Sequence, residues 1–455
     1  MRNMMEIIRD LSPLRMAPNS SGADECARIL KEELPFEVHE FLGGAEVNGW
    51  VCPMKWDPKV GTIFDSKNNL IYDGMWHPLA IIGYSQSFKG EILGSELKKH
   101  LFYPDAFDDA LVYHCDLFYK PFRKEWGFSV TKNFFNSIND EDFYSINLET
   151  NFEQGTMKVL EYVLHGETED SIIMNAHNCH AFCCNDDLSG VAVGIEVIRN
   201  IAKMKNRRFT YRLIIAAEHF GSIFYLNSLK DNEVERLKFG VFLEMLGTKG
   251  ALAFQRSFIG DNLIDKAFIN TLKHSGADWR TDLFRKIVGN DETCWEAAGY
   301  EIPFPSISRS LGKGHFPEYH TSRDSIDIID NEKLEESVRI VLESFSVLER
   351  DCVLHKKFKG LVALSHPKFS LYKPFYDPSE PGRKTIDETA RNWNYLMDCI
   401  PRYFNGQIRV LDIAERHNLP FRVVFDYAKE FCDKELVEME LAPISLPINN
   451  NLFPR

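Results

Sequence analysis

The amino-acid sequence predicts an α/β protein whose core is a mostly parallel sheet, with an inserted β-rich domain and a C-terminal winged-helix domain. Three observations lead to this prediction. Continuous apolar segments alternate with helical ones after about residue 156, a block of short segments and turns precedes them, and a small helical unit follows a Pro-rich connector. A chain of 455 residues that is 44% hydrophobic can bury about two to three domain cores.

The core domain is expected over residues 1–35 and 150–365. Helical periodicity follows a Ser/Gly start signal in "SSGADECARILKEEL", residues 20–34. The later strands are "DSIIMNAH", "YRLIIAAEH" and "FGVFLEML", and helical segments such as "LSGVAVGIEVIRNIAKM" and "NEKLEESVRIVLESFSVLERD" separate and follow them. Near-continuous apolar strands that alternate with helices indicate a parallel sheet covered on both faces.

The sequence pattern of residues 36–149 differs from that of the core and predicts an inserted domain. Short apolar segments such as "HPLAIIGYS" and "ALVYHCDLFY" alternate there with turns such as "DSKNNL" and "YDG". This spacing of short strands and turns is typical of a β-rich module.

The last predicted domain covers residues 380–455, after a Pro-rich connector from His366 to Pro381. Three helical segments, "ETARNWNYLMDCIPRYF", "VLDIAERHN" and "FRVVFDYAKEF", precede an extended segment, "ELVEMELAPISL", in the order of a winged helix. From Thr385 onward, eight Lys or Arg stand against eleven Asp or Glu. Because a protein that reads duplex DNA needs several cationic phosphate contacts, we expect this domain to dock on protein instead.

The overall composition narrows the class of protein further. The formal net charge of −14 argues against nucleic acid and membrane surfaces as partners. No segment is long and apolar enough to cross a bilayer, and "MRNMMEIIRDLSPLRM" lacks the apolar core of a secretory signal. The ten cysteines show no regular framework, so we expect reduced thiols and a cytoplasmic location.

Potential metal ligands stand at the ends of three predicted strands. The first strand ends at His177, the second at Glu218 and His219, and the third at Glu244. In an open parallel sheet, ligands bind outside the carboxyl ends of the strands. We therefore expect these side chains to converge, although they lie dozens of residues apart.

Two loops add further candidate ligands. The loop "NDDLSG" contributes Asp186, and the late loop "HFPEYHTSRDSID" contributes His320. Imidazole and carboxylate ligands suit zinc, and a catalytic zinc keeps one coordination position open. The pattern therefore predicts one or two zinc ions at this edge of the sheet.

These motifs resemble the family of co-catalytic zinc aminopeptidases, which also includes glutamate carboxypeptidases and glutaminyl cyclases. The resemblance covers about residues 1–35 and 150–350 and keeps the motifs in the family's order, as "NAH", "NDDLSG", "EHFG", "LEMLG" and "YHTSRDSID". It implies that Glu218 is the catalytic base. It also implies that the metal is held by His177, the bridging Asp186, His219, Glu244 and His320.

The motifs "SPLRMAPNSSG", "EWGF" and "PEYHTS" and the C-terminal helices resemble more closely a bacterial branch of that fold. The branch carries an inserted strand-rich module and a C-terminal winged helix, and it is linked with polysaccharide biosynthesis loci. The resemblance implies an enzyme, a zinc-dependent hydrolase. It would be an aminopeptidase-like exopeptidase or an amide deacylase that acts on a small peptide-like or acylated amine substrate.

Three positions depart from the family's pattern. Cys179 stands where the family has an Asp that orients the first imidazole, His219 replaces the second Glu of a Glu-Glu pair, and Glu244 replaces an Asp. Loss of an orienting carboxylate weakens a ligand, and His219 removes one negative charge from the site. His180 could compensate as a substitute ligand, and a single metal ion stays an alternative to two.

Each candidate ligand also has a purely structural interpretation. His177 and His219 could be satisfied polar ends of buried strands, and Asp186 could cap the following helix. Glu244 could pair with an arginine at the sheet edge, and His320 could be a turn residue. The three cysteines of the same region lack zinc-ribbon spacing and are expected to be buried packing groups: Cys179, Cys183 and Cys184.

The segment "GNDETCWEAAGYEIPFPSISRS" falls where the family has residues that line its specificity pocket. Asp291, Glu292 and Arg309 are the candidates there for binding an amine or an acid of the substrate. Tyr319, beside His320, could hydrogen-bond an oxyanion. A solvated loop and aromatic packing are the alternative roles of these residues.

Three functions are compatible with these patterns. The leading one is a metal-dependent hydrolase. The second is a catalytically impaired fold that binds a small ligand or a protein, and the third is a DNA-binding regulator, which the acidic C-terminal domain disfavours. The substrate, the number of metal ions and the oligomeric state are left open, with a homo-oligomer among the alternatives.

Overall fold

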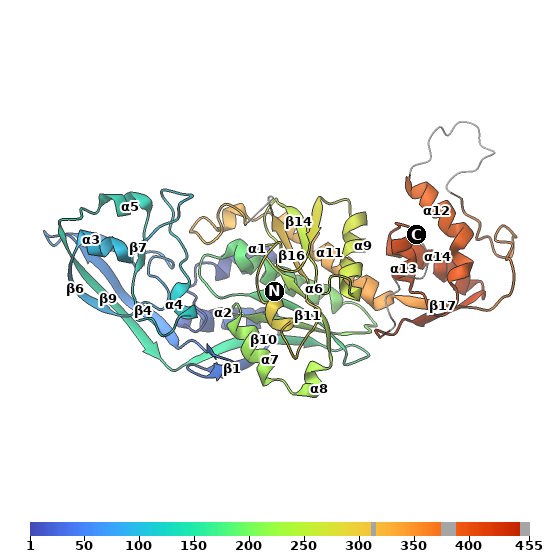
Figure 1. Ribbon diagram of the computed structural model, residues 1–455, viewed down its shortest axis with the longest axis horizontal. Helices are drawn as coiled ribbons and strands as arrows, with labels where there is room; N and C mark the ends of the chain where they lie inside the picture. Colours follow the sequence, from blue (N-terminus) through green and yellow to red (C-terminus); the bar gives the residue numbers. More distant parts are fainter. Residues whose placement is uncertain (311–314, 375–387, 446–455) are drawn as a thin grey trace. The chain divides into compact units, whose positions relative to one another are not determined.

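The computed structural model describes residues 1–310, 315–374 and 388–445 (Figure 1). The end of the predicted Pro-rich connector and the end of the last predicted extended segment lie outside these residues. The chain forms two compact units. The first comprises Met1–Phe258 with Arg280–Val338, and the second comprises Ile259–Trp279 with the chain from Arg339 onward.

An eight-stranded sheet forms the centre of the first unit, in the order β1-β10-β12-β11-β13-β16-β14-β15. The four strands β12, β11, β13 and β16 run parallel, and antiparallel pairings flank them on both sides. The predicted α/β fold around a large sheet with a parallel centre is confirmed. The strands are β1 (Glu37–Leu42), β10 (Thr156–Leu164), β11 (Ser171–His177), β12 (Thr210–Ala216), β13 (Leu237–Leu243), β14 (Ala251–Gln255), β15 (Trp279–Asp282) and β16 (Ser306–Ser310).

Helices cover both faces of this sheet. Leu213 of β12 faces Gly194 of α6 (Ser189–Ile201), where an added Cβ would lie 2.7 Å from the leucine side chain. The next residue, Ile214, belongs to a buried cluster with Tyr225 of α7 (Phe220–Ser228). Because successive strand residues point to opposite faces, α6 and α7 lie on opposite sides of the sheet.

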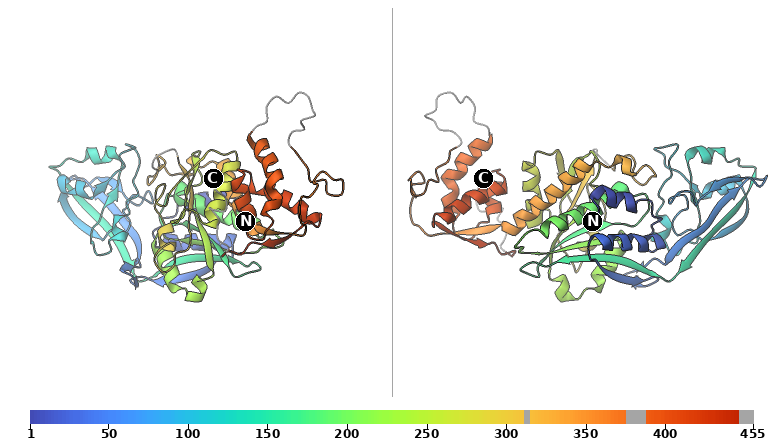
Figure 2. Two further views of the ribbon diagram at one scale, coloured as in Figure 1. Left: turned by 45° about the vertical axis from the view of Figure 1, so that its right-hand side comes forward. Right: turned by 180° about the vertical axis from the view of Figure 1, so that it is seen from behind.

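The core also contains two N-terminal helices and several short ones. The right-hand view of Figure 2 shows the N-terminal helices in front of the sheet, and α1 packs on α6. These elements are α1 (Met4–Leu11), α2 (Ser21–Glu33), η2 (Cys184–Leu188), α8 (Asp231–Val234), α10 (Glu292–Trp295) and η3 (Ile326–Ile328).

The inserted module is built on a four-stranded antiparallel sheet in the order β5-β4-β9-β6. Buried side chains such as Trp56, Tyr84 and Phe128 form its core. β1 lies within the predicted insert, but it pairs antiparallel with β10, so the start of the predicted insert belongs to the central sheet. The module contains β2 (Glu46–Val47), β3 (Trp50–Val51), β4 (Lys55–Phe64), β5 (Leu70–Asp73), β6 (Phe88–Leu93), α3 (Gly94–Leu97), η1 (Lys98–His100), β7 (Leu101–Phe102), α4 (Asp116–Tyr119), β8 (Phe128–Ser129), α5 (Lys132–Ser137) and β9 (Phe143–Glu153).

The second unit joins helices to a two-stranded antiparallel sheet of β17 and β18. The predicted extended segment contains β18, and its partner strand β17 comes from the chain before the connector. A buried ion pair between Arg409 and Asp351, at 3.0 Å, ties the helices to the start of that strand. The winged-helix class itself stays a prediction. The elements are α9 (Leu263–His274), the second half of α11 (Asn331–Arg350), β17 (Cys352–Lys356), α12 (Glu388–Cys399), η4 (Ile400–Tyr403), α13 (Val410–Arg416), α14 (Phe421–Asp433) and β18 (Val437–Leu441).

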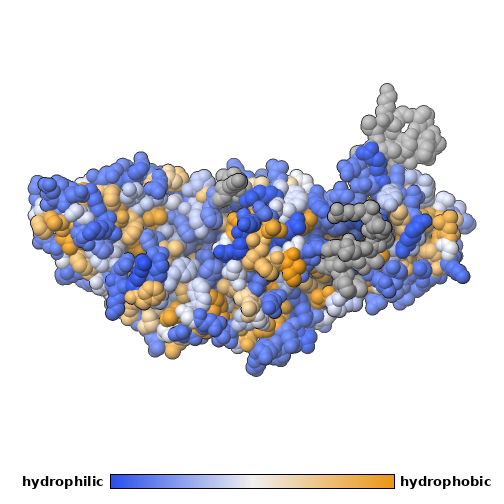
Figure 3. Space-filling model, in the orientation of Figure 1, coloured by the Kyte–Doolittle hydropathy of each residue, from blue (hydrophilic) through white to orange (hydrophobic). Residues whose placement is uncertain are grey.

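One face of the protein is drawn in Figure 3, coloured by hydropathy. Hydrophilic residues cover much of the face drawn in Figure 3, with apolar residues scattered between them. The helix α11 is 20 residues long and carries acidic and basic side chains along its length. Among the described residues, no helix has both the length and the apolar character needed to cross a membrane.

Candidate metal centre

His177, Asp186 and Glu244 converge at the carboxyl edge of the central sheet. His177 ends β11, Glu244 directly follows β13, and Asp186 lies in η2 before α6. All three are buried, and each offers one donor atom within 4.8 Å of the others. Nε2 of His177 lies 3.0 Å from Oδ1 of Asp186. We call this set the first site.

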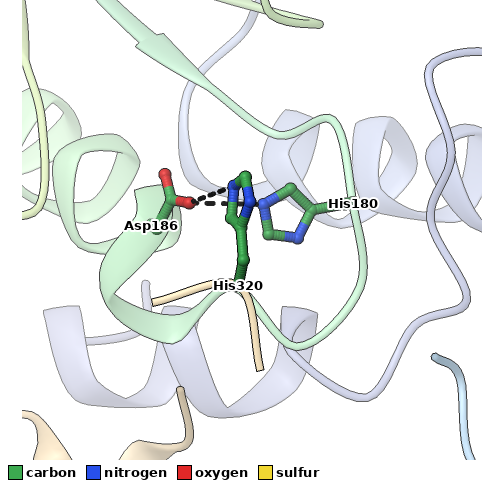
Figure 4. Close-up of side chains that lie close together, drawn as sticks. All are labelled: His180, Asp186 and His320. Atoms are coloured by element: carbon green, nitrogen blue, oxygen red, sulfur yellow. Dashed lines mark ion pairs between the residues drawn. The ribbon is translucent and has the colours of Figure 1, made fainter. Parts of the chain in front are cut away.

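Asp186 also belongs to a second group, with His180 and His320 (Figure 4). Nε2 of His320 and Nε2 of His180 lie 3.2 and 3.5 Å from Oδ2 of Asp186. Figure 4 shows the two imidazole rings on the same side of the carboxylate, with their nitrogens directed at it. We call this set the second site. Asp186 therefore stands between two groups of donors, one at each of its oxygens.

The donor atoms of both sites fit a metal ion. Four of them are buried and form no hydrogen bond of good geometry within the described chain: His177 Nε2, His180 Nε2, Asp186 Oδ2 and Glu244 Oε2. Buried polar atoms are nearly always paired, because leaving one unpaired costs about 1–3 kcal/mol. A divalent cation that prefers imidazole and carboxylate ligands would satisfy these atoms together.

Two further carboxylates fix the loop that carries Asp186. Asp324 accepts hydrogen bonds from the N–H groups of Asn185 and Asp186, at 2.7 and 3.0 Å. Asp187 accepts from the N–H of His177 at 3.3 Å and from the backbone two residues after β13 at 3.0 Å. Neither role was predicted. The only sequence signal is that Asp187 adjoins Asp186 in "NDD", whereas Asp324 lies far away in the chain.

Burial and neighbouring charges shift the pKa values of the two buried carboxylates in opposite directions. Burial raises the pKa of Asp186, but contacts with three imidazoles outweigh it and hold that pKa well below its ordinary value. At Glu244 burial dominates and raises the pKa well above its ordinary value. A bound cation favours the ionised form of a carboxylate, so metal binding would compensate the burial of Glu244.

The structure places His219 against Asp291, outside both sites. Oδ1 of Asp291 accepts a hydrogen bond from the His219 backbone N–H at 2.6 Å and lies 3.0 Å from Nδ1 of the ring. The other oxygen of Asp291 accepts from the Ser222 hydroxyl at 2.5 Å. The backbone of His219 has a φ of 55°, which is disfavoured for a residue other than glycine. The structure thus brings His180, rather than His219, to Asp186.

Glu218 lies beside His219. Its Oε1 is 3.6 Å from Nε2 of His219. Burial raises the pKa of Glu218, while the charges of His177 and Asp186 act on it in opposite directions. A carboxylate with a raised pKa in such a place is suited to accept and release a proton.

We expect His180→Ala and His219→Ala to differ in metal content. His180→Ala removes a donor of the second site and should release the ion held there. His219→Ala should keep that ion, because His219 is bound to Asp291. Inductively coupled plasma mass spectrometry of metal-loaded protein measures both variants. Metal loss from His219→Ala, together with full retention in His180→Ala, would contradict this assignment.

Cys179 contacts Nδ1 of His177, the ring nitrogen that does not face Asp186. Its Sγ lies 3.5 Å from Nδ1 of His177. Burial raises the pKa of Cys179, so the group is a neutral thiol at neutral pH, which is a weaker hydrogen-bond partner than a carboxylate. The other two cysteines of this loop, Cys183 and Cys184, are fully buried, and Cys183 Sγ donates to the carbonyl oxygen of His180 at 2.8 Å.

Cys179→Asp should tighten metal binding at the first site by about tenfold, and Cys179→Ala should weaken it by a similar factor, because the partner of a metal-binding imidazole sets its orientation and basicity. Competition between the protein and a chromophoric chelator gives the affinities. Thermal unfolding of the metal-free variants controls for damage to the fold. Equal affinities in all three proteins would show that Cys179 has no part in holding His177.

The four candidate substrate residues have different environments. Arg309 is buried and donates to two backbone carbonyls after β13 and to the Glu336 carboxylate. Glu292 is fully buried, and burial raises its pKa to about 7. Asp291 is bound to His219, whereas Tyr319 stacks on His320 with ring centroids 3.8 Å apart. Of the four, Tyr319 therefore contacts a residue of the second site, and Asp291 contacts His219 outside both sites.

The fold of the first unit is that of the zinc aminopeptidases. A zinc aminopeptidase from Bacillus subtilis superposes on 75% of this chain and 92% of its own, with a TM-score of 0.56 and 15% sequence identity. The predicted resemblance to this fold is confirmed.

Two matches from Clostridium acetobutylicum, one a sequence and one a solved structure, cover nearly the whole chain. One, named as a candidate polysaccharide biosynthesis protein with an aminopeptidase-like domain, is 28% identical over 437 residues, 95% of each chain. The other is the crystal structure of a candidate peptidase, with a TM-score of 0.81, 25% identity and 96% coverage of each chain. The family model described as "Domain of unknown function (DUF4910)" matches residues 5–351. The chain belongs to this family.

Proposed function

We propose that the protein is a zinc-dependent hydrolase that cleaves an amide bond in a small peptide-like or acylated amine substrate. The observation that carries this proposal is the shared carboxylate of Asp186, which has donor groups at both oxygens. The zinc aminopeptidase fold and the peptidase name of the Clostridium structure support it. Zinc is the proposed metal because all the candidate donors are imidazoles and carboxylates.

The proposed ligands divide into two sets around Asp186. His177 and Glu244 complete the first site, and His180 and His320 complete the second. A divalent ion bound there supplies Lewis-acid polarisation of the substrate carbonyl. The residues of the first site are buried, whereas the side chain of His320 in the second site is 25% exposed. We therefore propose that substrate approaches from the His320 side.

Glu218 is the proposed general base. It would take a proton from the attacking water at its carboxylate and return it to the leaving amine. His219 orients this carboxylate, because Asp291 holds its Nδ1 side while its Nε2 lies 3.6 Å from Glu218. In this proposal His219 is a positioning residue for the base instead of a metal ligand.

A cavity beside His219 supports a small substrate. Its volume is about 280 Å³, and its walls include Trp50 of the inserted module, Ile223 of α7 and Tyr300. This volume is near the lower end of the usual range for small-molecule sites, about 300–1,000 Å³. We propose that the apolar side chain or acyl group next to the cleaved bond occupies this cavity.

The test combines metal analysis with amine release. Zinc-loaded protein is incubated with aminoacyl amides, dipeptides and N-acetylated amino sugars, the last because of the polysaccharide name of the Clostridium relative. We expect bound zinc and release of amine from at least one class of substrate. Chelation of the zinc should stop the release of amine, and adding zinc back should restore it. Zinc near zero after purification with added metal would refute the proposal.

A ligand-binding module without catalysis is the second candidate. The thiol of Cys179 beside His177 and the distance of His219 from both sites favour it, because each weakens the resemblance to an active centre. Zinc at full occupancy, with no amine released from any substrate class, would favour this candidate over the hydrolase.

A further inference from the structure

A segment of the inserted module runs beside the loop that carries His320. The two segments form a short antiparallel ladder, although Leu111 and Ser322 lie 211 residues apart in the sequence. An ion pair between Asp109 and Arg323 extends the contact. The paired residues along the ladder are Leu111 with Ser322, Val112 with Thr321, and Tyr113 with His320.

The ring of Tyr113 contacts both imidazoles of the second site. It stacks on His180, with centroids 3.9 Å apart and planes at 20°. It also meets His320 edge to face, with centroids 4.9 Å apart and planes at 88°. Rotation about the last side-chain bond of histidine is broad and weakly restrained, so neighbouring groups decide the plane of the ring. Tyr113 is therefore one of the groups that set the planes of these two rings. Tyr319 also stacks on His320, with centroids 3.8 Å apart, and the Ala181 carbonyl oxygen lies 3.0 Å from Nδ1 of His180.

The backbone of His320 depends on the same contact. Its φ is 56°, in the left-handed region that a residue with a side chain seldom adopts without support from its surroundings. The N–H of Tyr113 donates to the carbonyl oxygen of His320 at 2.8 Å. Tyr113 thus holds His320 through a backbone hydrogen bond as well as through its ring.

The first site is held by other parts of the protein. His177 lies at the end of β11 and stacks near Phe242 of β13, with centroids 6.1 Å apart. Oε1 of Glu244 accepts a hydrogen bond from the side-chain amide of Asn290 at 2.9 Å. The two sites share Asp186, but the first is supported by the central sheet, whereas the inserted module contributes Tyr113 to the support of the second.

We propose that Tyr113 is a positioning residue for the second site, and that the inserted module thereby completes the metal centre. This inference rests on the proposed metal-dependent function and deepens it. The inserted module would then hold ligands of the metal centre through Tyr113, in addition to lining the cavity beside His219 with Trp50. The inference also predicts that the two sites respond differently to a change at Tyr113.

The test measures zinc binding at each site in the full-length protein. Metal-free protein is titrated with zinc in competition with a chelator, for the wild type, Tyr113→Leu and Tyr113→Phe. Leucine keeps apolar bulk but removes the flat ring, so the second site should weaken by about tenfold or more, while the first keeps its affinity. Phenylalanine keeps the ring and the backbone N–H and should restore the wild-type affinity.

Two controls separate positioning from general damage. Tyr144→Leu removes a buried tyrosine of the same module that lies on β9, and it should leave both affinities unchanged. In a His180→Ala background, Tyr113→Leu should have no further effect on the ion that remains, because that ion is held by His177 and Glu244.

The outcomes distinguish this inference from the proposed function. A wild type that binds no zinc overturns both. If the wild type binds zinc, the affinities of Tyr113→Leu decide the inference. Affinities that are unchanged, or that fall equally at both sites, would overturn the role of Tyr113 but not the proposed metal centre. Failure of Tyr113→Phe to restore the second site would also overturn it, since the ring would then not be the group that matters.

Discussion

Glu218→Gln is expected to lower turnover by about a hundredfold or more while metal content and fold stay unchanged, which is the usual scale for losing a general base. Glutamine keeps the shape of the side chain and removes the basic carboxylate. Glu218 lies 3.6 Å from the His219 ring and outside both candidate metal sites. Steady-state rates on the best substrate, with zinc content and the thermal unfolding midpoint measured on the same preparation, give the result.

The matched control is Glu196→Gln, the same change on the partly exposed face of α6, which should leave turnover unchanged. Two outcomes at Glu218 would contradict its role. Unchanged turnover would show that the proton is transferred elsewhere, and loss of zinc would show that Glu218 is itself a metal ligand.

Asp186→Asn is expected to abolish zinc binding at both sites and activity with it. Asp186 is the one residue that belongs to both groups of donors. An amide cannot supply the negative charge that balances two cations, and its nitrogen is not a metal ligand. Elemental analysis and amine release measure the effect.

Asp291→Asn provides the comparison, because it makes the same change at a buried carboxylate of the His219 cluster. It should retain both zinc ions. If Asp186→Asn kept its zinc and Asp291→Asn lost it, the metal would lie at His219, Asp291 and Cys294 instead.

The sequence carries enough information to predict the centre of the sheet and the place where the ligands meet. Each of the strands β11, β12 and β13 contains an apolar run, and an ionisable side chain ends the strand or follows it within two residues. Parallel strands end at one edge, so His177 and Glu244 had to approach each other once the strands were assigned. Asp186 was expected near them because its loop begins at the carboxyl end of β11, at the same edge of the sheet.

The choice between His180 and His219 could not be predicted, because it depends on contacts between distant parts of the chain. The side chain of His219 is bound to Asp291, 72 residues further along. His180 is held by Tyr113, which belongs to the inserted module. Neither contact leaves a periodic pattern or a spacing in the sequence, so the resemblance to the aminopeptidases favoured His219.

The strands that pair with β1 and β17 could not be predicted from the sequence for a similar reason. Each is a short strand, of six residues in β1 and five in β17. β1 pairs with β10 across the whole inserted module, and β17 pairs with β18 across the connector and three helices. The entropic cost of closing a loop grows slowly with the length of the loop, so sequence distance does not decide such pairings.

The positions of bound zinc test the central claim most directly. Crystals of the zinc-loaded protein, with diffraction recorded on both sides of the zinc absorption edge, locate the ions by their anomalous signal. We predict one peak among His177, Asp186 and Glu244 and a second among His180, Asp186 and His320. A peak only at His219, Asp291 and Cys294, or no peak at full zinc loading, would contradict the proposed metal centre.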